Sequence, residues 1–143
     1  MVVDGPVLAL DLGDARIGVA ISDPERRTAV PVGTIRTGAP DDVKAVVSLV
    51  RERGVTLVVV GHPLLLSGRA GARASQAEAF AEALRAVAGV PVVLHDERLS
   101  TSEADRSLRE RGLGGRERRA VIDRTAAAVI LESYLAGGRG SDR

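Results

Sequence analysis

The chain has 143 residues, a formal net charge of +1 at pH 7, no cysteine and two histidines. This length suits one domain over residues 1–143, with an ordered core over about 6–137 and a polar C-terminal tail. The lack of cysteine excludes disulfides and thiolate metal sites. No signal-peptide pattern or membrane-length apolar run is present, so we expect a soluble cytoplasmic protein with no membrane partner.

The basic residues are almost all arginine, since Lys44 is the single lysine among 20 Lys and Arg residues. A coding bias toward arginine explains the total, but not a cluster of six within residues 106–119. Arginine binds phosphates in a two-pronged geometry that lysine lacks. Phe80 and Tyr134 are the only aromatic residues, which argues against a base-stacking platform. We therefore expect any nucleic acid to be held by its backbone.

The first third of the chain is typical of strands. Residues 7–12 and 17–22 form alternating apolar patterns on either side of a turn at Gly13 and Asp14. A third strand is expected over residues 28–36, where Pro31 cannot donate a ladder hydrogen bond and so indicates a sheet edge. These elements predict a three-stranded antiparallel meander.

In the next segment the spacing of the apolar residues changes from that of a strand to that of a helix. Valines spaced three and four residues apart predict a helix that begins at Asp41 and Asp42 and ends at Gly54. Residues 55–60 form a continuous β-branched run, which indicates a central strand covered on both faces. After a loop over 61–71, a long helix is expected to end at Gly89. Its inward residues are predicted to be Ala77, Phe80, Ala81, Leu84 and Val87.

The last third is expected to hold a fifth strand and two helices. The strand is predicted over residues 91–95. A capping box over residues 100–103 opens a short helix, and a final helix ends at Gly137. A meander followed by alternating helices and strands predicts an α/β fold, with a five-stranded mixed sheet covered by helices.

Three carboxylates lie where a charge is costly to bury. Asp11 interrupts an apolar strand and faces the strand of Gly18 and Ala20; alternatively, it binds backbone amides in the following turn. Asp96 and Glu97 both follow the fifth strand, and alternation does not decide which of them faces the site.

Asp123 shares a helical stripe with Ala127, Ile130 and Tyr134; the alternative is a buried ion pair with Arg16 or another arginine. Acids that converge in a core repel one another, and a hard metal ion relieves that repulsion. Oxygen donors without thiols favour Mg²⁺ or Mn²⁺ over zinc. A two-metal site, with ions roughly 3.5–4 Å apart, would suit phosphodiester hydrolysis.

Four segments carry a family pattern: residues 10–23, 59–64, 96–101 and 121–123 with the Ala-rich helix that follows. Together they resemble the YqgF family of bacterial Holliday-junction-resolvase-like nucleases, also described as pre-16S ribosomal RNA nucleases. The resemblance covers about residues 7–136. It implies a three-layer RNase H-like fold, and it implies that Asp11, Glu97 and Asp123 are the acidic catalytic and metal-binding residues.

The chain departs from that family pattern in two places. Ala15 stands where members usually carry lysine, and Leu65 and Ser67 replace a polar Asn and an Asp. We expect these changes to affect substrate affinity or selectivity rather than the chemistry.

The resulting hypothesis is a metal-dependent endonuclease that acts on structured RNA, in 5′-end maturation of pre-16S rRNA. Branched DNA such as a Holliday junction is the alternative substrate, and a non-catalytic RNA-binding ribosome-assembly factor is the alternative class. A phosphate site like that of actin- and sugar-kinase-like ATPases is a further alternative, although it needs a second similar domain. The expected partners are precursor rRNA or branched DNA and the ribosome or its assembly factors, with the chain a monomer or homodimer. The candidate nucleic-acid contacts are Arg16, Arg98, Thr101, Arg106, Arg109, Arg116 and Arg119.

Overall fold

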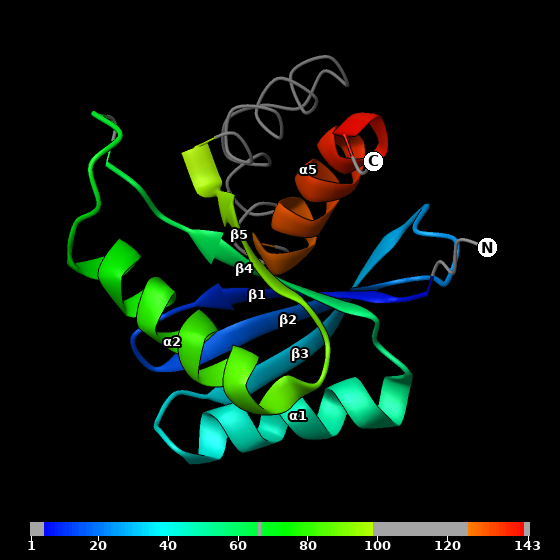
Figure 1. The fold of residues 1–143 in the computed structure, drawn as a ribbon, viewed down its shortest axis with the longest axis horizontal. Coiled ribbons are helices and arrows are strands. Elements are labelled where there is room, and N and C mark those ends of the chain that lie inside the picture. Colours follow the sequence, from blue (N-terminus) through cyan, green and yellow to red (C-terminus); the bar gives the residue numbers. More distant parts are fainter. Residues whose placement is uncertain (1–4, 66, 99–125, 142–143) are drawn as a thin grey trace.

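The computed structural model describes residues 5–65, 67–98 and 126–141. The strands of this part of the chain are β1 (Val7–Leu12), β2 (Arg16–Ser22), β3 (Ala29–Arg36), β4 (Leu57–His62) and β5 (Val92–Asp96). Its helices are α1 (Asp41–Arg53), α2 (Ala72–Ala88) and α5 (Ala126–Ser141). The five strands form one mixed sheet in the order β3-β2-β1-β4-β5, as Figure 1 shows.

The predicted antiparallel meander is confirmed. β1 pairs with β2, and β2 pairs with β3, which lies at the sheet edge as Pro31 indicates. The register shifts between Val19 and Ala20, so that Val32 of β3 is the extra residue of a bulge. The proline therefore sits where its missing N–H costs no central ladder bond.

The strands β4 and β5 run parallel to β1, which brings three carboxyl ends to one edge of the sheet. β1 pairs with β4 from Val7 and Leu57 onward, and β4 pairs with β5 up to His62 and Asp96. The fourth strand thus begins and ends two residues later than its β-branched run predicts. This edge is where sites collect in sheets of this kind.

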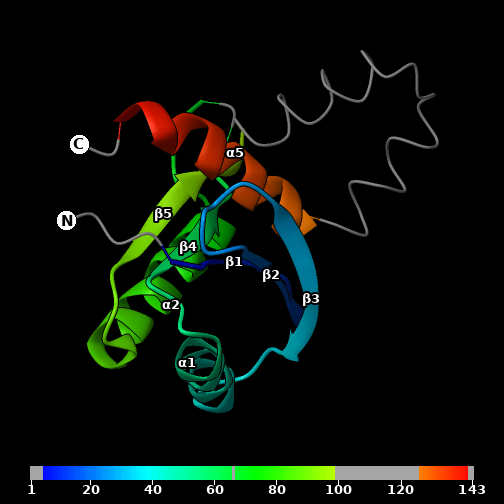
Figure 2. The same ribbon diagram turned by 90° about the vertical axis from the view of Figure 1, so that its right-hand side faces the viewer.

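Helices cover both faces of the sheet, with α5 above it and α1 and α2 below it in Figure 2. The alternation of β1 separates the two cores: Leu8 and Leu10 face α1 and α2, whereas Val7 and Ala9 face α5. The predicted α/β fold is confirmed. Among the described helices, none is long and apolar enough to cross a membrane.

Two expectations about the helices are wrong. Val87 is 52 % exposed, because the inward stripe of α2 continues from Leu84 to Ala88, four residues on. α5 continues beyond Gly137 to Ser141, since glycine weakens a helix without removing its hydrogen bonds. The helix expected to open at residues 100–103 lies outside the described residues, and so does the whole arginine cluster of residues 106–119. That residues 1–143 form one domain stays a prediction.

Ser22 joins the end of β2 to the start of β1. Its hydroxyl oxygen accepts a hydrogen bond from the backbone N–H of Val7 at 2.9 Å and donates to the carbonyl oxygen of Asp23 at 2.9 Å. The side chain is buried, so no water can replace these bonds.

We predict that Ser22→Ala lowers the free energy of unfolding by roughly 1–3 kcal/mol, because it leaves the buried N–H of Val7 without a partner. Urea denaturation followed by circular dichroism measures the change. Ser48→Ala, at an exposed position of α1, is the matched control and should be nearly neutral. Equal effects of the two substitutions would contradict this account.

Candidate active site

Asp11 lies near the carboxyl end of β1, on the face of the sheet that α5 covers. Its register partner in β2 is Gly18, on the strand that the sequence places opposite Asp11, so no side chain stands directly beside the carboxylate. Burial raises the pKa of Asp11 above its ordinary value, while the positive charge of Arg73 lowers it. The carboxylate is therefore held where its charged form is disfavoured.

Glu97 follows β5 directly and turns back over the end of β4. A Cβ atom at Gly61 would overlap the Glu97 carboxylate and the end of the Ile130 side chain, so glycine is required for this placement. Burial, followed by the negative charge of Asp11, raises the pKa of Glu97 from 4.5 to about 7. Asp11 therefore lies close enough to Glu97 for its negative charge to disfavour the ionisation of Glu97.

Asp96, the neighbouring acid, points to a different partner. Its carboxylate accepts hydrogen bonds from Arg98, from Nε at 3.0 and 3.1 Å and from Nη2 at 2.7 Å. These bonds lower the pKa of Asp96. The alternation of side chains along the strand does not decide between Asp96 and Glu97. The ion pair between Asp96 and Arg98 does, because it leaves Glu97 as the acid that faces Asp11.

Two residues at this edge were not among the sequence candidates. Arg73, in the first turn of α2, is exposed and its charge acts on both Asp11 and Glu97. His62 ends β4, and its Nε2 hydrogen-bonds Oε2 of Glu78 at 2.8 Å. A helix that follows a parallel strand begins at the carboxyl edge, so the position of Arg73 after β4 was the available signal.

The remaining predicted residues divide into three groups. Arg16 is exposed and lines a hollow of about 300 Å³ together with Asp11. Arg98 forms an ion pair with Asp96, and the neighbouring His95 hydrogen-bonds Ser133 at 2.9 Å. The other candidates lie outside the described residues: Thr101, Arg106, Arg109, Arg116, Arg119 and Asp123.

The pair of acids fits a hard cation. Both carboxylates are partly buried, both have raised pKa values, and a cation between them would offset both burial and mutual repulsion. Within the described ranges, no three His, Asp or Glu side chains form a metal-binding group. Further ligands of a cation held by this pair would be water, a substrate phosphate or a residue outside the described ranges.

The strand order, with helices on both faces of the sheet, is that of an RNase H-like fold. The Thermus thermophilus RuvC in complex with a Holliday junction substrate has the same fold, with a TM-score of 0.61 and 15 % identity over 96 % of each chain. A second structure of Thermus thermophilus RuvC gives a TM-score of 0.60 over 95 % of this chain and 97 % of the other.

The chain belongs to the RuvX family, described as Holliday junction resolvase, which matches residues 5–137. Three relatives are named "Putative pre-16S rRNA nuclease". The relative from Anaeromyxobacter sp. (strain Fw109-5) is 49 % identical over 91 % of this chain and 96 % of its own. Those from Thermobifida fusca (50 % identity; 92 % and 87 % coverage) and Chloroflexus aurantiacus (44 %; 96 % and 91 %) are similar. The family resemblance expected from the sequence is confirmed, and the chain is a member of a nuclease family.

We predict that Glu97→Gln stabilises the metal-free protein at high pH. Because the folded pKa of Glu97 is above 4.5, the folded state binds more protons than the unfolded state between pH 4.5 and about 7. Stability from this group is therefore present at low pH and is lost as pH rises through that window. The variant should exceed the wild type by no more than about 1 kcal/mol at pH 5 and by at most about 3 kcal/mol at pH 8.

Denaturation in EDTA at both pH values measures this difference. Glu132→Gln, an exposed acid on α5, is the control and should show no such pH dependence. A Glu97→Gln effect that is equal at pH 5 and pH 8 would rule out the raised pKa.

Proposed function

We propose that this chain is a divalent-metal-dependent endonuclease that hydrolyses phosphodiester bonds in structured RNA, in 5′-end maturation of pre-16S rRNA. The observation that carries the proposal is the facing pair of Asp11 and Glu97 at the carboxyl edge of the sheet. Two neighbouring, partly buried carboxylates destabilise the fold when no cation is bound, and together they can bind a divalent cation. Membership of a nuclease family supports the same chemistry.

Asp11 and Glu97 would hold the metal, with Asp123 as the proposed third ligand. Carboxylate oxygens favour Mg²⁺ or Mn²⁺. When bound, such an ion would lower the pKa of a water nucleophile and offset charge on the leaving oxygen.

The chain's own cations would position the phosphates. Arg73 is exposed beside the acid pair, and no salt bridge joins it to another residue in the described part of the chain. Its guanidinium can therefore bind a phosphate without breaking an ion pair. Arg16, which lines a hollow together with Asp11, would contact the same strand of the nucleic acid. Arg98, Thr101, Arg106, Arg109, Arg116 and Arg119 are proposed as further contacts along the backbone.

The identity of the nucleic-acid substrate is the more specific part of the proposal. The names of the relatives support precursor rRNA and, with it, a cytoplasmic setting and contact with the ribosome or its assembly factors. The family description supports branched DNA as a second candidate substrate for the same chemistry. A monomer and a homodimer are both compatible with this proposal.

Asp11→Asn tests the chemistry directly. Loss of an outer-sphere partner of a metal ligand costs up to roughly 100-fold, so loss of a ligand charge should lower the cleavage rate by more than that. The assay follows cleavage of a precursor rRNA and a four-way DNA junction with Mg²⁺ or Mn²⁺. Asp41→Asn, an exposed acid in the first turn of α1, is the matched control.

Each outcome decides between the candidates. Cleavage of the RNA but not the junction supports rRNA processing, and the reverse result supports a resolvase. Undiminished cleavage by Asp11→Asn would remove the mechanism. Salt-dependent RNA binding without cleavage under any divalent ion would identify a non-catalytic assembly factor.

We further predict that Gly61→Ala lowers the cleavage rate by roughly 100-fold, the loss that a displacement of about 1 Å can cause. The added Cβ atom would overlap the Glu97 carboxylate and force it away from Asp11. Gly137→Ala is the matched control, because a Cβ atom there has open space. Circular dichroism checks that both variants fold, and an unchanged rate in a folded Gly61→Ala would contradict the placement of Glu97.

A further inference from the structure

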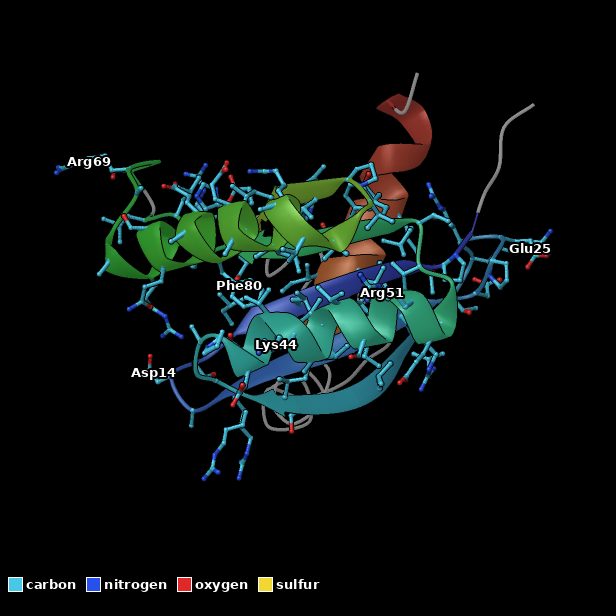
Figure 3. All side chains as sticks on the ribbon, turned by 60° about the horizontal axis from the view of Figure 1, so that its bottom comes forward. Asp14, Glu25, Lys44, Arg51, Arg69 and Phe80 are labelled. Atoms are coloured by element: carbon cyan, nitrogen blue, oxygen red, sulfur yellow. The ribbon has the colours of Figure 1, made fainter. Side chains whose placement is uncertain are left out.

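A cavity of about 380 Å³ opens next to the acid pair, on the other side of the sheet edge from α5. Its apolar wall includes Ile17, Val43 and Phe80, and Glu97 lies on its border. Figure 3 shows Phe80 in the space between α2 and α1, with Asp14 at the same end of the molecule. The volume lies within the range of about 300–1,000 Å³ that is usual for small-molecule sites.

One wall of this cavity carries a buried acid that the proposed metal chemistry does not use. Asp42 is 5 % exposed, and its two oxygens accept hydrogen bonds from the backbone N–H groups of Val43 at 2.7 Å and Gly38 at 3.1 Å. Each carboxylate oxygen has a second lone pair. Asp42 can therefore accept hydrogen bonds from a ligand while it keeps its bonds to the backbone.

The rim of the cavity places a cation beside the acids. Arg73 and Gln76 both line the cavity, and the charge of Arg73 acts on Glu97. A ligand with a flat, largely apolar body could pack against the apolar wall and donate hydrogen bonds to Asp42. A phosphate of the same ligand at the mouth of the cavity could bind Arg73. A nucleotide has this arrangement of groups.

We propose that this cavity binds one unstacked base of the substrate, next to the phosphodiester that is cleaved, and that it prefers guanine. This inference rests on the proposed nuclease function for the identity of the ligand. Guanine presents two adjacent N–H donors, at N1 and N2, which match the two oxygens of a carboxylate such as Asp42. Uracil presents a single N–H between two carbonyl oxygens, which the carboxylate would repel.

A base can enter the cavity only if it leaves its stack, which is least costly where the nucleic acid is already unpaired. The cavity would thus select single-stranded or branched positions over continuous duplex. It would hold one base rather than a run of stacked bases, in keeping with the near absence of aromatic residues. The backbone would still supply most of the affinity.

The test measures binding without cleavage. Fluorescence anisotropy in EDTA compares two labelled RNA pentamers, UUGUU and pentauridylate, at one salt concentration. The wild type should bind UUGUU roughly tenfold tighter, the discrimination expected from a bidentate contact to one base. Ala79→Leu, at an exposed position that lines the cavity, should reduce this ratio to about one.

Ala86→Leu is the matched control, because Ala86 is an exposed alanine of the same helix; it should keep the wild-type ratio. Ala83→Leu, also on the cavity wall, is the second blocking variant should Ala79→Leu not fold. Equal affinity of the wild type for the two pentamers, no measurable binding of UUGUU, or a preference that survives both blocking variants would overturn the base site. Because no divalent ion is present, this result is independent of whether the protein cleaves RNA.

Discussion

The burial of Asp11 and Glu97 at one edge of the sheet is the constraint on which the rest of the site depends. Burial raises the pKa of both carboxylates, and the negative charge of Asp11 adds to the rise at Glu97. Arg73 lowers both pKa values, yet both remain raised. The fold therefore holds two carboxylates where their charged forms are disfavoured, and the proposed divalent cation would offset that cost.

The sheet produces this arrangement through its topology. Parallel pairing of β1, β4 and β5 brings Asp11, Gly61 and Glu97 to one edge, although they are far apart in the sequence. Two of the positions around the acids are glycines. A Cβ atom at Gly18 would make only ordinary contacts, whereas a Cβ atom at Gly61 would overlap the Glu97 carboxylate. The missing side chain of Gly61 is therefore the one that the placement of Glu97 requires.

Most of the framework could be predicted from the sequence because it follows from local pattern. Alternation along β1 places Asp11 opposite the small residues of β2, and Pro31 marks the edge strand. The choice between Asp96 and Glu97 could not be made that way, since it depends on the ion pair of Asp96 with Arg98. Arg73 was missed for a related reason. Its charge acts on Asp11 and Glu97 because the fold brings the start of α2 near both acids, and the pattern of residues along α2 alone does not predict this.

The proposed metal site and the proposed base-binding cavity lie on opposite faces of the sheet. Asp11 lies on the α5 face, whereas the cavity with Asp42 lies between α1 and α2 on the other face. Glu97 borders both, because it follows β5 at the edge where the faces meet. A strand that crosses this edge could place its phosphate at the acids and a neighbouring base in the cavity. If the proposed cleavage and base binding both hold, a movement of Glu97 would change the acid pair and the border of the cavity together.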